Sequence, residues 1–331
     1  MEKLLTVSIA AYNVSAYLRK ALDSLCVPDL LGELEVLVVN DGSTDDTPDI
    51  ARDYERRYPG TFRLIDKENG GYGSTVNCGV REARGKYFRL LDGDDYFDPA
   101  NFLAFFRQLR TSTADLLLTP FSKKRDVEGS APELKEQAWH SLIGRVLTPS
   151  ETDTPLICGI WHMTVLTERI RRNLVKLPRH TLYTDQLFAF CAMAGASKIA
   201  FCGEAVYVYR VGRDGQSISA KSLRAHYADE LKVLKKMLRL YAKSPLVTDE
   251  NRAMLLIRMG RYYYFGYRTV CLLLRSAEHY RLLKSVERTA KKWCPDVYEE
   301  AGRQSLKIRL MRRFGGLFYC AAAGRESLWA K

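Results

Sequence analysis

Short apolar runs alternate with segments of helical character over the first 95 residues, and no other feature of the sequence constrains the fold as strongly. The apolar runs are residues 6–11, 34–39, 62–65 and 86–91. The segments between them show helical spacing or helix-capping signals, at about 16–25, 47–58 and 74–84. Parallel strands need such crossover connections. The alternation therefore predicts an α/β fold with a Rossmann-like, mostly parallel sheet flanked by helices.

Polar side chains follow three of these predicted strands. The first strand runs into Tyr12 and Asn13, the second into residues 40–43, and the fourth into residues 92–95. Ligands of open α/β sheets bind beyond the carboxyl ends of the strands. The three carboxylates of Asp-Gly-Asp-Asp at 92–95 repel one another unless a cation neutralises them, and Mg²⁺ or Mn²⁺ prefers such oxygen ligands. The alternative is a solvated turn, because Asp and Gly both favour turns.

Two other nucleotide-binding sites are excluded by their glycine patterns. A dinucleotide site needs G-x-G-x-x-G between the first strand and the first helix, where residues 10–14 read Ala-Ala-Tyr-Asn-Val. The glycines at 70–73 come later and have the wrong spacing. No Walker-type G-x-x-x-x-G-K-[ST] occurs either.

Cysteine usage and hydropathy indicate a cytoplasmic protein. The eight cysteines are scattered and include no C-x-x-C pair, which is typical of small core residues in a reducing compartment. No stretch approaches the roughly 18 apolar residues that span a bilayer. The nearest candidate, residues 254–274, contains Arg258, Arg261 and Arg268.

Positive charge is concentrated in the last third of the chain. Residues 221–331 hold 24 Lys and Arg against 10 Asp and Glu, a net charge of +14, although the whole chain carries +12. This region is predicted to be helical, and its charge suits an anionic partner such as a membrane surface. Within it, residues 306–319 place apolar side chains on one broad face and Arg309, Arg312 and Arg313 on the other. Packing of this region on the rest of the chain is the alternative, and no recognised motif favours nucleic acid.

Over about residues 4–220 the chain resembles family 2 glycosyltransferases, whose nucleotide-binding domain has the GT-A fold. The matching motifs occur in the family's order: residues 7–13, 38–45, 68–71 with 77–79, 85–87, 91–95 with Pro99, 184–188, and 206–210 with 217–219. The resemblance implies a catalytic domain over 1–220, followed by a basic helical region over 221–331.

The resemblance also implies roles for individual residues in donor binding. Tyr12 would stack on the donor's base, a uracil, and Asp41 would accept a hydrogen bond from the ring N–H. Asp94 would coordinate Mg²⁺ or Mn²⁺ directly, and Asp92 would hold the ribose and the metal. Asp95 would orient the donor or support the metal's ligands. The remaining donor-pocket positions are Ala10, Asn69, Gly70 and Gly93, although Gly70 also suits a plain turn.

Asp185 matches the family's catalytic base, which removes the proton from the acceptor hydroxyl during an inverting transfer. The alternative is that Asp185 caps the helix that follows it. Arg210 and Arg213 match a region that faces the diphosphate or the acceptor, although either could be a solvated surface charge. Trp161 and His162 match the acceptor side, where an indole could stack on a sugar or simply belong to the core.

The sequence departs from the family pattern at Ala11, Asn40 and Thr184, where proline, aspartate and glutamate are common. Only Thr184 matters for the chemistry, because it precedes the predicted base. The function implied is an inverting hexosyl- or N-acetylhexosaminyltransferase that uses a UDP-sugar and a cell-envelope glycan or lipid-linked acceptor. The alternatives are a non-catalytic carbohydrate- or membrane-binding protein on a degenerate GT-A fold, and a nucleotidyltransferase, whose usual activation loop is missing after the first strand.

Overall fold

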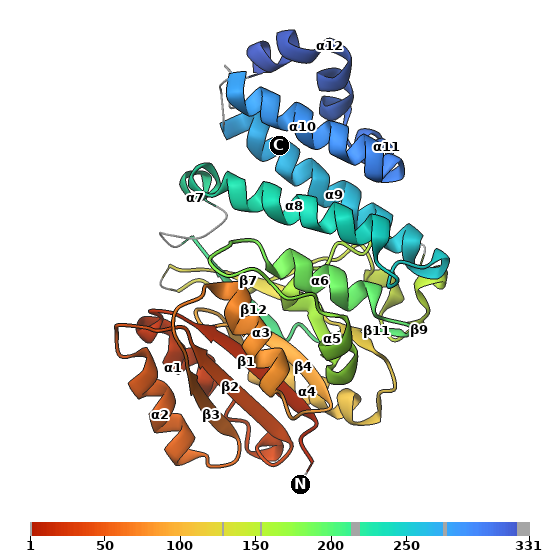
Figure 1. The fold of residues 1–331 in the computed structure, drawn as a ribbon. Helices are drawn as coiled ribbons and strands as arrows, with labels where there is room; N and C mark the ends of the chain where they lie inside the picture. Colours follow the sequence, from red (N-terminus) through yellow and green to blue (C-terminus); the bar gives the residue numbers. More distant parts are fainter. Residues whose placement is uncertain (1, 128, 153, 213–218, 274–276, 323–331) are drawn as a thin grey trace. The chain divides into compact units, whose positions relative to one another are not determined.

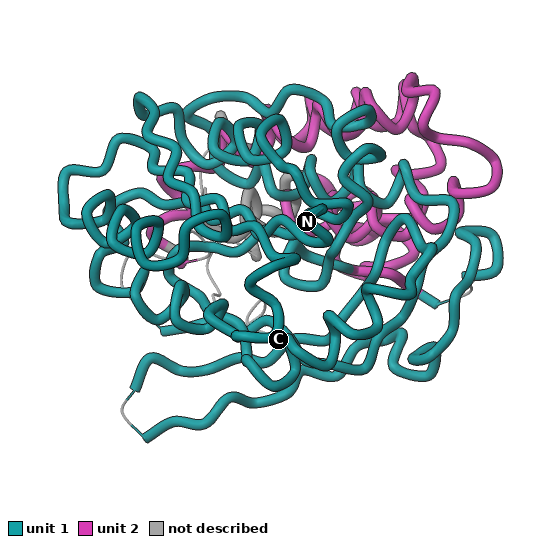
Figure 2. The backbone as a smooth tube through the Cα atoms, turned by 90° about the horizontal axis from the view of Figure 1, so that it is seen from below, with its two compact units in different colours: residues 1–154, 158–213 teal, residues 155–157, 214–331 magenta. Residues whose placement is uncertain are grey.

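The computed structural model describes residues 2–127, 129–152, 154–212, 219–273 and 277–322. The chain separates into two compact units (Figure 2). The first contains residues 1–154 and 158–213, and the second contains residues 155–157 and 214–331. Each unit is described by itself.

An eight-stranded sheet forms the centre of the first unit, in the order β3-β2-β1-β4-β10-β6-β11-β9 (Figure 1). One half is parallel and consists of β1 (Leu5–Ala11), β2 (Leu34–Asn40), β3 (Phe62–Asp66) and β4 (Tyr87–Asp92). The other half is mixed and consists of β6 (Leu116–Leu118), β9 (Val146–Leu147), β10 (Met163–Leu166) and β11 (Ile199–Phe201). Strand β10 is antiparallel to both of its neighbours. The predicted α/β fold with a mostly parallel sheet is confirmed.

Helices cover both faces of this sheet. Val7 and Ile9 of β1 belong to a core cluster that includes side chains of α1 (Ser15–Asp23), α2 (Thr47–Arg57) and α4 (Pro99–Thr111). Phe88 of β4 points to the opposite face, where its ring centroid lies 6.0 Å from that of Phe188. That face carries α3 (Tyr72–Glu82), α5 (Thr167–Asn173) and α6 (Asp185–Ala194). Because the strands are apolar on both faces, the sheet is buried between the two helix layers.

A second, four-stranded sheet lies in the same unit, in the order β5-β12-β7-β8. Its strands are β5 (Tyr96–Phe97), β7 (Phe121–Arg125), β8 (Glu133–Lys135) and β12 (Tyr207–Val211). Strand β12 pairs antiparallel with β5, which follows directly after the acidic residues 92–95. This pairing brings a late segment of the chain to the end of β4. Short 3₁₀ turns occur at Pro28–Leu30, His140–Leu142, Pro149–Glu151 and Ile160–His162.

The described part of the second unit is helical. Its elements are α7 (Ala220–Ala225), α8 (Tyr227–Lys243), α9 (Asp249–Leu273), α10 (Ala277–Trp293), α11 (Pro295–Gln304) and α12 (Leu306–Ala322). Helix α8 buries Leu231, Leu234, Leu238 and Tyr241, as their helical spacing predicts. Within the described residues, no helix combines the length and the apolar character that crossing a bilayer would require.

Helix α12 departs from the uniform amphipathic helix expected at residues 306–319. Gly315 has φ 55° and ψ −131°, which interrupts the helical backbone. Arg312, expected on a polar face, is instead engaged inside the unit: its Nε lies 3.2 Å from Glu287 Oε1, and its Cζ lies 3.4 Å from the centroid of the Tyr298 ring. Leu306 and Phe314 are exposed. The side chains of Leu317 and Phe318 lie outside the described part of the chain.

Candidate active site

The three polar strand ends lie side by side. In the parallel register Ala11 pairs with Asn40 and Ala10 pairs with Asp92. The Asp41 N–H donates to the Ala11 carbonyl at 2.8 Å, and the Gly93 N–H donates to the Ala10 carbonyl at 3.2 Å. Residues from three motifs thus share one edge of the sheet, where open α/β sheets bind their ligands.

Tyr12 projects from the loop after β1, and 52% of its surface is exposed. The next residue, Asn13, has φ 51° and is bonded to the loop after β2. Its N–H donates to Ser43 Oγ at 3.0 Å, and its Oδ1 accepts from the Thr44 N–H at 2.8 Å. An exposed aromatic ring on a loop held in this way is suited to stacking on a planar ligand.

Asp41 is buried and holds the loop between β3 and α3. Its carboxylate accepts hydrogen bonds from the backbone N–H groups of Gly70 and Gly71 at 3.0 and 2.8 Å, and from Ser74 Oγ at 3.3 Å. Lys67 Nζ also contacts Oδ1 of Asp41. The carboxylate therefore shapes this loop through contacts within the chain, and contact with the donor's base stays a prediction. Sequence reasoning missed Lys67. Its position directly after a strand, where residues of open α/β sheets contact ligands, could have marked it as a candidate.

Asp95 anchors the acidic turn to β12. It is buried and accepts hydrogen bonds from the Tyr207 hydroxyl and from the Arg210 N–H, both at 2.7 Å. The same hydroxyl accepts from the Asp92 N–H at 3.2 Å. Asp95 is thus a supporting residue of the turn. The sequence pattern does not single out Tyr207, because its contact depends on the pairing of β12 with β5.

The charge of Asp185 acts on the acidic turn at 92–95. Burial, and then the charge of Asp94, raise the pKa of Asp92 to about 7, and Asp185 contributes in the same direction. Burial also raises the pKa of the Tyr72 hydroxyl, and the charges of Asp92 and Asp185 raise it further. Tyr72, which sequence reasoning did not single out, therefore lies within electrostatic reach of both acidic groups.

Asp185 is the first residue of α6, and Thr184 is the N-cap. Thr184 makes no side-chain cap hydrogen bond, so the base role of Asp185 and the alternative that Asp185 caps this helix both stay predictions. Gln186 Nε2 donates to Asp185 Oδ2 at 2.8 Å. The partial positive charge at the helix N-terminus favours an ionised carboxylate at this position.

The segment that leads to Asp185 is bonded to the β3–α3 loop. The His180 N–H donates to the Gly70 carbonyl at 2.8 Å, and Arg179 Nη2 donates to the Asn69 carbonyl at 3.1 Å. Three residues before His180, the Leu177 N–H donates to Asn77 Oδ1 at 3.0 Å. Asn69 and Gly70 are therefore joined to the chain just before α6.

Arg210 makes contacts within the first unit. Its Nη2 lies 2.7 Å from Asp126 Oδ1, and its Cζ lies 4.7 Å from the centroid of the Tyr17 ring. A role at the diphosphate remains a prediction. Arg213, like residues 214–218, lies outside the described residues. On the expected acceptor side, the Trp161 ring stacks on Tyr209, with centroids 5.5 Å apart, and His162 is buried.

The acidic turn fits a hard divalent cation. Asp92 Oδ1 is buried without a hydrogen bond of normal geometry among the described residues, and the Tyr72 hydroxyl nearby lowers the pKa of this carboxyl against the larger effect of burial. No three His, Cys, Asp or Glu side chains of the described ranges form a complete metal site. A cation held by Asp92 and Asp94 would therefore take its other ligands from donor phosphates and water, which suits Mg²⁺ or Mn²⁺.

The model of a protein family described as "Glycosyl transferase family 2" matches residues 6–174. The uncharacterized glycosyltransferase EpsJ of Bacillus subtilis is 29% identical over 221 residues, which cover 63% of this chain and 62% of EpsJ. The putative glycosyltransferase EpsH of the same organism is 38% identical over 91 residues, 28% of this chain and 26% of EpsH. The chain thus spans less than two thirds of either relative.

Solved structures of two proteins share the fold. S. aureus TarS superposes with a TM-score of 0.69 at 19% identity, over 97% of this chain and 55% of TarS. The mannosyltransferase PcManGT from Pyrobaculum calidifontis, in complex with GDP-Man and Mn²⁺, gives 0.54 at 17% identity, over 100% of this chain and 88% of PcManGT. A shorter form of TarS, residues 1–349, in complex with UDP-GlcNAc, gives 0.56 at 19% identity, over 94% and 92%.

Proposed function

The chain belongs to glycosyl transferase family 2 and has the GT-A fold, and we propose that it is an inverting transferase that moves a sugar from a nucleotide diphosphate sugar to a hydroxyl group. The observation that carries this proposal is the sheet edge shared by Tyr12, Asp41 and the acidic turn at 92–95, together with the charge of Asp185, which acts on Asp92. Asp92 and Asp94 lie at the end of a strand, and Asp185 lies at the start of a helix. Carboxylates from two separate elements are therefore available for two roles, metal binding and proton removal.

We assign the donor to the edge formed by β1, β2 and β4. Tyr12 would stack on the base, and Asp41 would accept from its ring N–H while it holds Gly70 in place. The lone pair of Asp41 Oδ2 that does not accept from Gly71 can serve this contact. Ala10, Asn69 and Gly93 would line the same pocket. A UDP-sugar is our first choice, because a TarS form of the same fold was solved with UDP-GlcNAc.

Asp92 and Asp94 would hold the divalent cation, whose positive charge would stabilise the departing diphosphate. The Mn²⁺ in the complex of PcManGT supports this assignment. Asp185 would take the proton of the acceptor hydroxyl as its oxygen attacks the anomeric carbon, opposite the breaking bond to the diphosphate. Asp95 and Tyr207 would keep the turn in place, and Arg210 and Arg213 would lie on the diphosphate side.

The acceptor in this proposal is a cell-envelope glycan or a lipid-linked sugar, and the enzyme is a hexosyl- or N-acetylhexosaminyltransferase. Residues 1–220 would carry the catalysis. A cytoplasmic location agrees with Cys78, Cys158, Cys191, Cys202 and Cys294, which are buried thiols. The exposed Leu306 and Phe314 of α12 are the apolar side chains that could reach the inner face of the cell membrane.

The proposal is tested with UDP-GlcNAc and Mn²⁺. UDP release from the donor, with water as acceptor, reports turnover, and calorimetry of UDP with Mn²⁺ reports binding. Asp185→Asn should bind UDP with unchanged affinity and lose turnover by at least about a hundredfold. Asp94→Asn should lose the Mn²⁺ dependence of UDP binding.

Asp46→Asn is the matched control, because Asp46 is an exposed aspartate without a side-chain cap hydrogen bond. It should behave as the unmodified protein in both assays. Undiminished turnover of Asp185→Asn would remove Asp185 as the base. Binding of none of a panel of nucleotide sugars, with or without the metal, would overturn the transferase itself.

A further inference from the structure

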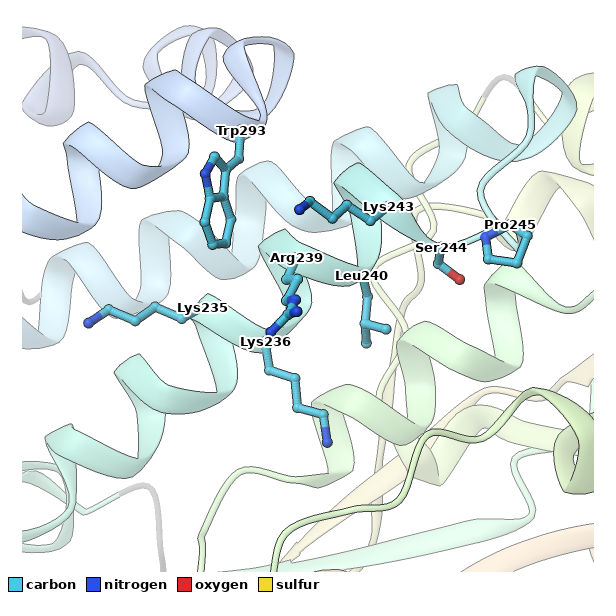
Figure 3. A pocket seen from close by; sticks show the side chains of 8 residues that line it. All are labelled: Lys235, Lys236, Arg239, Leu240, Lys243, Ser244, Pro245 and Trp293. Atoms are coloured by element: carbon cyan, nitrogen blue, oxygen red, sulfur yellow. The ribbon is translucent and has the colours of Figure 1, made fainter.

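A basic pocket lies wholly within the second unit, on α8 and at the end of α10 (Figure 3). Its volume is about 640 Å³. Four of the side chains that line it are cationic, and one is an indole; the lining residues are Lys235, Lys236, Arg239, Leu240, Lys243, Ser244, Pro245 and Trp293. None of them is acidic.

Helical spacing places three of the cations in one row. Lys235, Arg239 and Lys243 follow one another at intervals of four residues, and all three are exposed. The buried Leu234 and Leu238 directly precede Lys235 and Arg239, lie on a different side of α8, and pack into the unit. The amphipathic pattern of α8 therefore fixes the direction of this row.

Trp293 is held beside the row by contacts of its neighbours. Cys294 Sγ lies 3.2 Å from the Leu238 carbonyl, and the Tyr241 hydroxyl donates to Asp296 Oδ2 at 2.7 Å. These contacts fix the end of α10 against α8, and Figure 3 shows the Trp293 ring directed from α10 toward α8. Lys243 Nζ lies 5.7 Å from the centroid of this ring.

The stability of the fold does not explain the row of cations. Like charges four residues apart on a helix repel each other. Within the described residues, Lys235, Arg239 and Lys243 form no ion pair. An anionic ligand would relieve this repulsion.

The indole adds a second requirement to the ligand. Trp293 is 41% exposed, so part of its ring is available for contact. A flat aromatic face beside cations contacts the C–H face of a sugar ring, while the cations contact its charged substituents. The pocket is concave, and the Trp293 ring and the cationic side chains line it together. A ligand that carries both rings and negative charges matches this arrangement better than a bilayer surface does.

We propose that this pocket binds a segment of an anionic glycan, a chain of sugars that carries phosphate, sulfate or carboxylate groups. Lys235, Arg239 and Lys243 contact the anionic groups, and Trp293 stacks on a sugar ring. The site contains none of the donor and catalytic residues assigned above, and it does not depend on the transferase activity.

The test measures binding of fluorescently labelled dextran sulfate oligosaccharides to the full chain by anisotropy. Neutral dextran supplies the rings without charge, and polyphosphate supplies charge without rings. Dextran sulfate should bind more tightly than either one. The triple variant Lys235→Gln, Arg239→Gln, Lys243→Gln should bind it at least about tenfold more weakly at low salt, and added salt should reduce this difference.

A second triple variant controls for net charge. Arg107→Gln, Arg172→Gln and Lys198→Gln remove the same three charges from exposed positions in the first unit, and should leave the affinity within about twofold. Trp293→Ala should weaken dextran sulfate binding several-fold and leave polyphosphate binding unchanged, while Trp293→Phe keeps most of the affinity.

Three outcomes would overturn the proposal. One is equal loss of affinity in the two triple variants, which would mean that only net charge matters. Another is equal binding of polyphosphate and dextran sulfate with no effect of Trp293→Ala. The third is binding of anionic phosphatidylglycerol vesicles, or of duplex DNA, that needs the row of cations while dextran sulfate does not bind. Thermal unfolding of each variant confirms that the protein is folded, and the readout requires no turnover.

Discussion

The Tyr207 hydroxyl donates a 2.7 Å hydrogen bond to Asp95 Oδ2, and both side chains are buried. Because the same hydroxyl accepts from the Asp92 N–H, one phenol on β12 holds two positions of the acidic turn. The metal-binding carboxylates of our proposal are therefore positioned by a strand that lies more than a hundred residues further along the chain.

Tyr207→Phe removes this phenol oxygen and leaves the Asp95 carboxylate with one donor fewer. We expect the free energy of unfolding in urea to fall by about 1–3 kcal/mol, because a buried polar group loses its partner. UDP should also bind more weakly in the presence of Mn²⁺, since the turn is less well positioned.

Tyr87→Phe is the matched control for this variant. The Tyr87 hydroxyl donates to the Ser112 carbonyl at 3.0 Å from the opposite end of β4. Its loss should lower stability to a similar extent without a change in UDP affinity. Equal losses of UDP affinity in the two variants would contradict a specific role for Tyr207.

Tyr12→Ala separates binding from stability. The ring is 52% exposed, so its removal should change the free energy of unfolding by less than about 0.5 kcal/mol. If the ring stacks on the base, the dissociation constant of UDP should rise about tenfold in calorimetry. Tyr12→Phe keeps the aromatic face and should stay within about twofold of the unmodified protein. Unchanged UDP affinity in Tyr12→Ala would place the base elsewhere.

Gly71→Ala tests the contact between the β3–α3 loop and the segment before Asp185. Gly71 has φ 76°, and a Cβ there would lie 3.0 Å from the backbone nitrogen of His180. Because Gly71 has ψ 172°, a backbone that is essentially restricted to glycine, we expect a loss of stability that exceeds the roughly 1 kcal/mol typical of a positive φ alone, together with slower turnover in the UDP-release assay.

Gly60→Ala provides the reference for that backbone cost. Gly60 has φ 82°, and a Cβ there would meet nothing within 4 Å. This variant should lose about 1 kcal/mol in urea unfolding and keep its turnover. If the two variants lose the same stability and the same activity, the approach of Gly71 to His180 has no consequence.

Asp45 links the starts of two helices, and its contribution to stability should depend on pH. Its carboxylate accepts from the Ser15 N–H and from the Thr47 N–H, both at 3.0 Å. Burial raises the pKa of this group, but the hydrogen bonds at Thr47 and Ser15 outweigh burial and lower the pKa to about 2. Because this pKa is below the unfolded value of about 3.9, the stabilisation is present above about pH 4 and is lost as the pH falls toward 2.

Asp45→Asn should therefore cost about 1 kcal/mol of unfolding free energy at neutral pH, and the difference from the unmodified protein should shrink near pH 3. Urea unfolding at several pH values measures both quantities. Asp46→Asn, at the neighbouring N-cap position that lacks a side-chain hydrogen bond, should show no such dependence. A cost for Asp45→Asn that is constant with pH would rule out ionisation as its source.

The parallel half of the sheet was predictable because its signals are local. Each of β1 to β4 is an apolar run of five to seven residues followed by a helical segment. The mixed half was not, because β10 is only four residues long and pairs with Arg89 and Leu117, which lie far apart in the sequence. Arg89 itself illustrates the difficulty. It is a fully buried guanidinium in a strand that reads as apolar, and it donates to Thr164, Thr119 and the Trp161 carbonyl.

The candidate site shows the same division between local and distant signals. Asp92, Asp94 and Asp41 follow strands directly, so their place at the sheet edge could be inferred from the chain alone. The positions of Tyr72 and Tyr207 depend on how α3 and β12 pack against distant parts of the chain. The residues next to each tyrosine in the sequence do not reveal this packing. For Asp41, a pattern of residue types could not show that Lys67, Gly70, Gly71 and Ser74 already surround the carboxylate.

The hydrogen bond from the His180 N–H to the Gly70 carbonyl has a consequence for the divergence of this protein. It joins main chain to main chain, so it limits the side chain at position 180 only through the φ of 45°, which favours Gly, Asn, Asp or His, but it allows no change in the number of residues that bring this position to Gly70. Insertions or deletions between Lys176 and Thr184 would break the register of the two loops. Natural variation in this stretch should therefore proceed at constant loop length, with His180 replaced by residues that adopt a positive φ.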